Sequence, residues 1–240
     1  MQKKTLQKSI CSYCGVGCGI LVETDQKGKL TVSGDPDHPV NKGMLCSKGK
    51  NLNYVAQDTS DRILYPEMRW SRNHGMQRVS WDTAMDRAAS VFKSIIRKHG
   101  PDSVGFYVSG QCLTEEYYLV NKLTKGFIGT NNIDTNSRLC MSSAVVGYKQ
   151  LVGEDAVPIS YEDIELADCL LIAGANPAWC HPILFRRIEA RKQENPEVKI
   201  IVVDPRKTQS CAIADLHLQI KPGTDVALYN AIARRLKVGS

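Results

Sequence analysis

The sequence predicts an α/β protein in which a small β-rich domain precedes a doubly wound, mainly parallel α/β domain. Residues 1–60 hold four grouped cysteines and two short alternating segments, which favour strands. Residues 61–240 alternate short apolar runs with segments whose apolar residues recur at three- and four-residue spacing, as in βαβ units. A length of 240 residues with 42% hydrophobic and 23% charged residues is typical of a globular protein.

The expected elements follow in chain order. Residues 19–23 and 29–33 alternate apolar and polar side chains around a polar turn, which predicts a hairpin. After a linker with Pro66, Ser80 caps a predicted helix that ends at Gly100-Pro101. Then come a strand at 104–108, helices at 115–127 and 141–152, a strand at 169–173, a helix at 182–193, a strand at 199–203 and a helix at 224–236. The apolar run at 169–173 is typical of a strand buried on both faces, so we expect helices on both faces of the sheet.

Charge and terminal sequence restrict the partners. The 31 Lys and Arg residues are dispersed and the net charge is only +6, so we expect no nucleic-acid partner. The charge suits a polyphosphate or an acidic redox partner, or a solvated surface with no partner. No apolar stretch approaches the ~18 residues that span a bilayer, so no membrane association is expected. The first ten residues lack an apolar core, a cleavage site and a twin arginine, and we predict a cytoplasmic protein.

Nine cysteines in a chain without an export signal favour metal binding over disulfides. Cys11, Cys14 and Cys18 lie within eight residues, and Cys46 follows after 27 further residues. Three close thiolates and a distant fourth suit a [4Fe-4S] cluster, and the glycines between them favour backbone amides that face the sulfurs. A structural zinc site, which usually pairs two Cys-x2-Cys knuckles, and unligated thiols are the alternatives. Lys48 stands beside the last ligand, where its charge could stabilise added negative charge; the alternative is a solvated lysine.

Two cysteine segments and several later motifs carry a family resemblance. The segments are Cys11-Ser-Tyr-Cys14-Gly-Val-Gly-Cys18-Gly and Asn41-Lys-Gly-Met-Leu-Cys46-Ser-Lys48-Gly49. The later motifs are Ser109-Gly-Gln111, Gly129-Thr-Asn-Asn-Ile-Asp134, Asn136-Ser-Arg-Leu-Cys140-Met, Gly174-Ala-Asn-Pro-Ala-Trp-Cys-His181, Val203-Asp-Pro-Arg-Lys-Thr208 and Pro222-Gly-Thr-Asp225. Together they resemble the molybdopterin bis-guanine-dinucleotide oxidoreductases, which include nitrate reductases and formate dehydrogenases. Ser12 departs from the family's usual proline, which affects loop stiffness but removes no ligand.

The resemblance implies a role for each motif. Residues 1–60 would form the [4Fe-4S] cluster domain and residues 61–240 an incomplete molybdopterin-dinucleotide-binding domain. Cys140 would bind molybdenum, and Lys48 would lie between the cluster and the nearer pterin of a molybdenum bis-molybdopterin guanine dinucleotide. The implied cofactor contacts are Gln111, Asn136, Gly174, Asn176, His181, Asp204, Arg206, Thr208, Gly223, Thr224 and Asp225. Most of these follow predicted strands, where open α/β sheets bind ligands. Taken singly, Asn176 or Asp225 is more often a helix cap.

The residue after the implied metal ligand indicates the substrate. Formate dehydrogenases usually place histidine there, whereas this chain has Met141, which offers no proton acceptor. The resemblance therefore implies the reduction of nitrate to nitrite by oxygen-atom transfer, in the cytoplasmic assimilatory branch. The electron donor would be ferredoxin, flavodoxin or an NAD(P)H-dependent reductase subunit. A formate dehydrogenase and a molybdenum-free electron-transfer subunit are the alternatives.

Two further expectations concern the chain's extent and its other thiols. Catalytic subunits of the family are several times longer, so we expect this chain to be an amino-terminal fragment that is inactive alone. Four cysteines fall outside the cluster and molybdenum motifs, and we predict that each is a small buried apolar group; they are Cys112, Cys169, Cys180 and Cys211.

Overall fold

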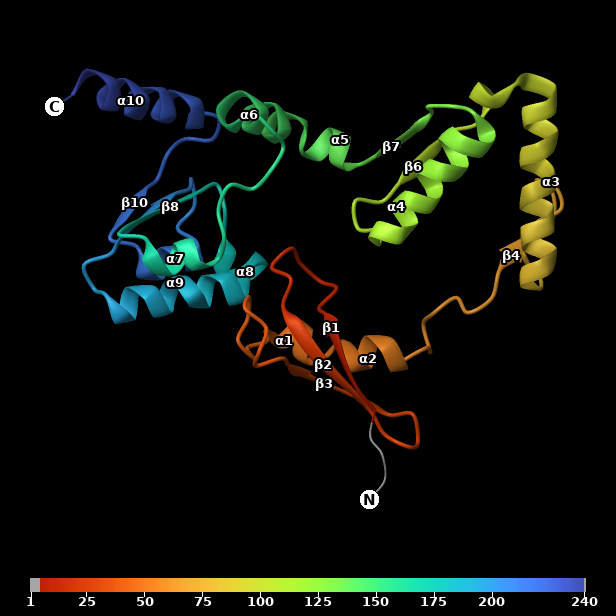
Figure 1. The fold of residues 1–240 in the computed structure, drawn as a ribbon, viewed down its shortest axis with the longest axis horizontal. Coiled ribbons are helices and arrows are strands. Elements are labelled where there is room, and N and C mark those ends of the chain that lie inside the picture. The colour runs from red at the N-terminus through yellow and green to blue at the C-terminus, as the bar shows by residue number, and fades with distance from the viewer. Residues whose placement is uncertain (1–4, 240) are drawn as a thin grey trace. The chain divides into compact units, whose positions relative to one another are not determined.

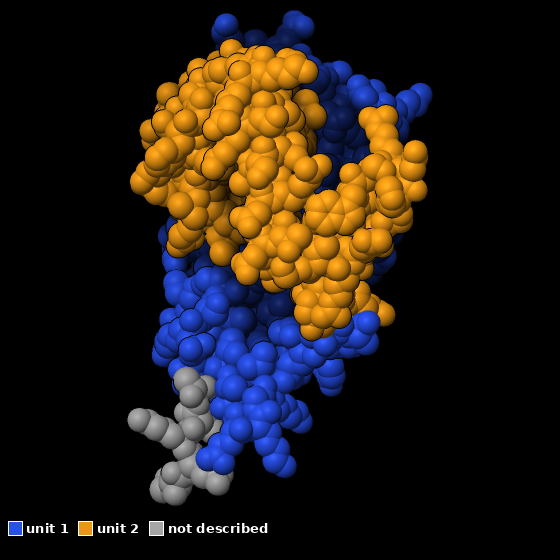
Figure 2. Space-filling view, turned by 90° about the vertical axis from the view of Figure 1, so that its right-hand side faces the viewer, with its two compact units in different colours: residues 1–60, 159–240 blue, residues 61–158 orange. Residues whose placement is uncertain are grey.

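The computed structural model describes residues 5–239, which form two compact units (Figures 1 and 2). Unit 1 combines the first 60 residues with the residues from 159 onward, and unit 2 is residues 61–158. The expected boundary near residue 60 coincides with the end of the first segment of unit 1. The contacts add a second boundary near residue 158, which the sequence did not predict. The assignment of residues 1–60 and 61–240 to two domains stays a prediction.

The first segment of unit 1 is an antiparallel sheet followed by two short helices. Its strands run in the order β1 (Thr5–Ile10), β2 (Gly19–Thr24) and β3 (Leu30–Gly34). The predicted hairpin is β2–β3, and the Asp25 carboxylate closes its turn by accepting from the amides of Lys27 and Lys29 at 2.8 Å. β1 was not predicted. The helices are α1 (Ser47–Lys50) and α2 (Leu52–Gln57).

The second segment of unit 1 is a parallel three-stranded α/β structure with the strand order β10-β9-β8. The strands predicted at 169–173 and 199–203 and the helices predicted at 182–193 and 224–236 are all present. The elements are α7 (Glu162–Leu166), β8 (Cys169–Ala173), α8 (Pro177–Cys180), α9 (Pro182–Glu194), β9 (Lys199–Val203), the 3-10 helix η3 (Gln209–Ile213), β10 (Leu216–Leu218) and α10 (Asp225–Val238).

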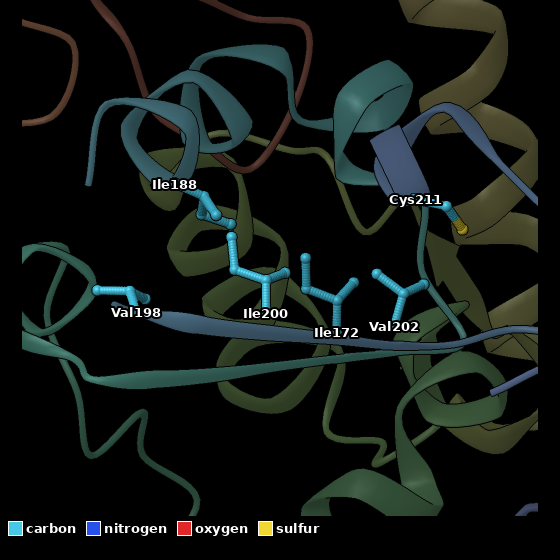
Figure 3. Packing of buried hydrophobic residues seen from close by; sticks show 6 residues of the cluster. All are labelled: Ile172, Ile188, Val198, Ile200, Val202 and Cys211. Atoms are coloured by element: carbon cyan, nitrogen blue, oxygen red, sulfur yellow. The ribbon is translucent and has the colours of Figure 1, made fainter. Parts of the chain in front are cut away.

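One face of this parallel sheet is the core of unit 1. Figure 3 shows Ile188 of α9 pointing toward Ile200, with Ile172 and Val202 on the same side of the strands. Ile200 and Val202 are fully buried. The expectation that 169–173 is buried on both faces is wrong for the described residues: β8 alternates, and its Leu171 side is 52% exposed.

A partly exposed polar contact ties α9 to the sheet. Lys192 Nζ donates to Val198 O at 2.6 Å and to Asp215 Oδ1 at 2.9 Å, and Asp215 Oδ2 accepts from the Ile200 amide at 2.8 Å. The Lys192 ammonium and this amide lower the pKa of the Asp215 carboxyl below its ordinary value of 3.8. The contact fixes the register between the helix and the edge of the sheet.

Unit 2 begins with a short antiparallel pair of strands, which is followed by a long helix and a two-stranded parallel βα segment. Ser80 Oγ accepts from the Thr83 amide at 3.1 Å and Gly100 ends the helix, both as predicted. The predicted helix 115–127 is in fact an α-helix that continues as a π-helix. The elements are β4 (Glu67–Met68), β5 (Gln77–Arg78), α3 (Trp81–His99), the 3-10 helix η1 (Pro101–Ser103), β6 (Phe106–Val108), α4 (Thr114–Asn121), the π-helix η2 (Lys122–Ile128), β7 (Ile133–Thr135), α5 (Ser137–Cys140) and α6 (Ser142–Val152).

None of the helices within residues 5–239 is long and apolar enough to cross a bilayer.

Candidate cofactor-binding site

The cysteine triplet occupies a closed loop between β1 and β2. The Cys11 amide donates to Cys18 O at 2.8 Å, which joins the two ends of the loop. Gly17 adopts a φ of +73°, a conformation that favours glycine and that turns the chain back toward β2. Val16 and Cys18 are buried, so the loop is anchored on the apolar core of this part of unit 1.

Asn41 connects the triplet to the loop of the fourth cysteine. Its Oδ1 accepts from the Gly19 amide at 2.8 Å, and its Nδ2 donates to Gly19 O at 3.0 Å and to Met44 O at 2.8 Å. The side chain is completely buried. Gly19 follows Cys18 directly and Met44 precedes Cys46 by two residues, so one amide side chain fixes the spacing of the two ligand segments.

All four cysteines line a single cavity, at positions far apart in the sequence. Cys11, Cys14, Cys18 and Cys46 share it with Lys48. Burial, and then the nearby sulfurs of the other three, raise the pKa of the Cys18 thiol to about 11. Across residues 5–239, no three His, Cys, Asp or Glu side chains converge on a single metal ion. Four thiols around a shared space fit the donor set of a cluster, in which each iron takes one thiolate.

Lys48 also lines the cavity of the four cysteines. Its side chain is exposed at the mouth of the cysteine cavity, and its Nζ lies 5.9 Å from the centroid of the Tyr13 ring. Both residues flank cysteine ligands, Tyr13 in the triplet loop and Lys48 in α1. The separation is within the range of a cation–π contact, and the ammonium stays accessible to solvent.

A second group of predicted residues meets at the carboxyl edge of the parallel sheet. Ala173 pairs with Val203 and Val203 with Leu218, so the loops that follow β8, β9 and β10 begin side by side. The Gly174 amide donates to Val203 O at 2.9 Å, and Gly174 has a φ of +59°. The edge is where open α/β sheets bind ligands.

The turn after β9 is built on Asp204. The buried Asp204 carboxylate accepts from the Arg206 amide at 2.7 Å, and His217 Nε2 lies 2.9 Å from Asp204 O. Asp204 therefore shapes the turn from inside, while Arg206 is exposed and presents its charge. Thr208 precedes η3 and is half-buried.

Asn176 bridges two of these loops. Its Oδ1 accepts from Ser210 Oγ at 2.7 Å, and Ser210 Oγ accepts from the Ala178 amide at 3.2 Å. Asn176 occupies the N-cap position of α8, as the cap interpretation expects, but its side chain makes no capping bond. His181 is half-buried, and its Nδ1 lies 3.3 Å from Cys180 Sγ.

The Pro222–Asp225 motif leads into α10. Gly223 has a φ of +80°, Thr224 Oγ1 donates to Lys221 O at 2.6 Å, and Asp225 is the first helical residue. The N-cap position belongs to Thr224, and Asp225 lies in the first turn, where a carboxylate is favourable to the helix dipole. The cap interpretation is therefore wrong for Asp225.

Unit 2 brings together the other predicted residues. β6 and β7 are parallel with Val108 opposite Thr135, so the loops that carry Gln111 and Asn136 leave the same edge. A Cβ on Gly110 would lie 2.8 Å from Asn136 Oδ1, which explains why glycine precedes Gln111. Cys140 ends α5 with an exposed thiol. Gln111 and Asn136 are also exposed, so this edge presents an amide pair and a soft thiol ligand.

The remaining cysteines differ from the expectation of buried apolar groups. Cys211 is buried in the sheet core, as predicted, and Cys112 is half-buried. Cys169 and Cys180 are exposed, which contradicts the prediction. Cys169 lies on the open face of β8, and Cys180 ends the short helix α8 at the surface.

Comparison with known families assigns both segments. The model described as "Molybdopterin oxidoreductase Fe4S4 domain" matches residues 5–58, and that described as "Molybdopterin oxidoreductase" matches residues 62–237. The chain belongs to the molybdopterin oxidoreductase family. This membership gives the protein a [4Fe-4S] cluster and a molybdopterin cofactor, and it confirms the fold class and the resemblance found in the sequence.

Relatives in this family include several nitrate reductases. The chain is 48% identical over 233 residues to a nitrate reductase of Klebsiella oxytoca, which covers 95% of this chain and 26% of that protein. It is 48% identical over 226 residues to a periplasmic nitrate reductase of Desulfovibrio desulfuricans, covering 94% and 30%. Acetylene hydratase from Pelobacter acetylenicus matches structurally with a TM-score of 0.78 at 26% identity, covering 96% of this chain and 32% of that one. The chain thus spans about a quarter to a third of these relatives.

The sequence analysis missed the residues that hold the two cysteine loops together. Asn41 was visible only as part of a motif, and Tyr161 was not singled out at all. The hydroxyl of Tyr161 donates to Val16 O at 2.8 Å, inside the triplet loop and 145 residues away. The motif around Asn41 was a signal for its importance, but no local pattern indicates the partner of Tyr161.

Proposed function

We propose that the chain is the amino-terminal part of a nitrate reductase, which reduces nitrate to nitrite by oxygen-atom transfer. The observation that carries the proposal is 48% identity over 95% of this chain to a protein named nitrate reductase. The geometry is compatible with it, because the implied ligands of the cluster share one cavity and the implied ligand of molybdenum is exposed at a sheet edge.

Different residues of the chain would hold each of the two cofactors. When bound, the cofactors supply oxygen-atom transfer at molybdenum and one-electron transfer at the cluster. Cys11, Cys14, Cys18 and Cys46 would hold the cluster, and Cys140 would supply a thiolate to molybdenum. Lys48 keeps a positive charge at the mouth of the cysteine cavity, where it would stabilise electrons arriving at the cluster.

In each unit, the proposed cofactor contacts lie at the carboxyl edge of a parallel sheet. At the edge of unit 1, Gly174, Asn176, His181, Asp204, Arg206, Thr208, Gly223, Thr224 and Asp225 lie in the three loops that follow parallel strands. At the edge of unit 2, exposed amides of Gln111 and Asn136 flank the loop of Cys140. The exposed guanidinium of Arg206 is suited to a phosphate, and Gly174 and Gly223 let the backbone approach a ligand closely.

Met141 distinguishes nitrate reduction from formate oxidation. It follows Cys140 directly and lines an open pocket together with Arg138. A thioether neither accepts nor donates a proton at neutral pH, so this position cannot serve a reaction that removes a proton from the substrate. Arg138, in contrast, offers positive charge to an anionic substrate.

We also propose a cytoplasmic location and an assimilatory role, with ferredoxin, flavodoxin or an NAD(P)H-dependent reductase subunit as electron donor. The exposed free thiols of Cys169 and Cys180 support this, because a reducing compartment keeps such thiols unpaired. Cell fractionation followed by an activity assay tests the location, and activity in the periplasmic fraction contradicts it.

The proposed reaction is tested by assaying the anaerobically purified full-length protein with nitrate and with formate side by side. We expect nitrite to form from nitrate with a reduced viologen as donor, and no reduction of an acceptor by formate. Turnover of formate without turnover of nitrate would refute the proposal.

A further inference from the structure

Arg187 is a buried cation that the cysteine motif does not include. It lies in α9, and its side chain is only 3% exposed. Its Nη1 donates to Val40 O at 2.8 Å and to Pro39 O at 3.0 Å, in the segment just before Asn41. The guanidinium therefore supports the loop that carries Cys46, from a position 141 residues away in the sequence.

Tyr161 extends this contact to the cysteine triplet. The centre of the Arg187 guanidinium lies 5.3 Å from the centroid of the Tyr161 ring, and the Tyr161 hydroxyl donates to Val16 O at 2.8 Å. Tyr161 also packs against the apolar cluster that contains Val16 and Cys18. Burial, and then the sulfurs of Cys18 and Cys14, raise the pKa of Tyr161, so the ring lies within electrostatic range of both ligands.

The first turns of α9 approach the cysteines as well. Pro182 and Ile183 line the cavity of the four cysteines, and Arg186 Nη1 donates to Leu45 O at 3.4 Å, next to Cys46. The amino-terminal end of this 13-residue helix carries a partial positive charge. The positive end of α9 thus borders the cavity, and Arg187 follows in the second turn of the same helix.

The negative charges near Arg187 are less buried than Arg187 itself. Glu165 Oε1 lies 2.7 Å from Arg187 Nη2 and 3.0 Å from Lys42 Nζ, and its side chain is 35% exposed. Glu162 is exposed. Water screens these carboxylates more than it screens the guanidinium, so Arg187 retains a field inside the unit.

We propose that Arg187 raises the reduction potential of the [4Fe-4S] cluster, as a positioning residue that holds a buried positive charge behind both ligand loops. An added electron makes the cluster more negative, and a nearby buried cation stabilises that state. This role is separate from that of Lys48, which lies at the exposed mouth of the cavity. It depends on the cluster and not on nitrate, so it stands or falls independently of the proposed substrate.

The test is a redox titration of the cluster in full-length protein, followed by electron paramagnetic resonance of the reduced cluster. Arg187→Gln should shift the equilibrium between reduced and oxidised cluster about tenfold toward the oxidised form. For one electron, this corresponds to a reduction potential about 59 mV lower. Arg187→Lys, which keeps the charge, should remain closer to the parent than Arg187→Gln. Glu165→Gln removes the partly exposed negative charge and should move the potential in the opposite direction, by a few-fold in the same equilibrium.

The matched control is Arg191→Gln, one turn further along α9. Arg191 binds Ala167 O at 3.1 Å and Asp168 at 3.5 Å and contacts neither cysteine loop. The reduction potential of the cluster in Arg191→Gln should equal that of the parent. Equal shifts of the reduction potential in Arg191→Gln and Arg187→Gln would overturn the proposal. It would also be overturned if the potentials of Arg187→Gln and Glu165→Gln moved in the same direction, or if neither moved.

Glu165→Gln keeps the proposal testable if Arg187→Gln binds less iron. It leaves both carbonyl contacts of Arg187 in place and removes only the half-exposed ion pair with Lys42 from the loop, while the local charge changes. A raised potential in Glu165→Gln at parental iron content supports an electrostatic role. An unchanged or lowered potential in that variant means that Arg187 only holds the loop, and overturns the proposal.

Discussion

Asn41→Ala should loosen the two cysteine segments without affecting the parallel sheet. Asn41 makes three hydrogen bonds, two buried ones with Gly19 and a partly buried one with Met44 O. A net value of about 1 kcal/mol for each gives a local loss of about 3 kcal/mol, because alanine removes all three bonds and leaves the Gly19 amide without its acceptor. At about 1.4 kcal/mol per factor of ten, amide exchange near Gly19 should accelerate about 100-fold.

The assay is hydrogen exchange followed by mass spectrometry on the full-length protein, with iron content measured in the same samples. The matched control is Asn51→Ala, which removes a single bond, from Asn51 Nδ2 to Ser47 O at 2.8 Å, at an exposed position. Asn51→Ala should hardly change the rate of amide exchange near Gly19 and should leave iron binding unchanged. Equal exchange rates in Asn41→Ala and the parent would refute the view that one side chain fixes the ligand spacing.

Three further predictions concern the cluster ligands, the electron path and acid stability. Cys46→Ser should lower the iron bound per chain sharply, while Cys169→Ala, an exposed thiol outside the cavity, should leave it unchanged; iron loss in both would contradict the ligand assignment. Lys48→Met should leave both cofactors bound but slow nitrate turnover, because the charge near the cluster is gone, and parental turnover would make Lys48 dispensable. Since the Lys192 contact lowers the folded-state pKa of Asp215, the resulting stability is present above about pH 4 and is lost as the pH falls through the lowered pKa. In acid-unfolding curves, Asp215→Asn should lack this contribution to the free energy of unfolding above pH 4. A curve identical to the parent's would contradict the prediction.

The secondary structure was predicted best where one local signal determines it. Ser80 and Gly100 determine the ends of α3, and the apolar runs at 169–173 and 199–203 are β8 and β9. β1 was missed because its residues mix lysine with apolar side chains that stay exposed, such as Leu6 at 55% and Ile10 at 53%. That strand is held by backbone pairing with β2, which leaves no burial pattern in the sequence.

The individual segments of the candidate site were predictable from the sequence, but the contacts between distant segments were not. The cysteine spacing indicated the cluster ligands, and glycines at strand ends indicated the loops of the parallel sheet. The pairing of Tyr161 with Val16 and of Arg187 with Val40 depends on how distant segments fold together. The one-sided burial of β8 also depends on what covers the sheet, which the apolar run alone does not determine.

The central claim is that Cys140 is the molybdenum ligand of a nitrate-reducing enzyme. It is tested most directly by Cys140→Ala in the full-length protein, with Cys169→Ala as a matched control of another exposed thiol. The account predicts that Cys140→Ala keeps the visible absorption of the cluster, loses nitrate reduction and has a changed molybdenum resonance spectrum, while the control keeps all three. Nitrate reduction at the parental rate by Cys140→Ala would contradict the account.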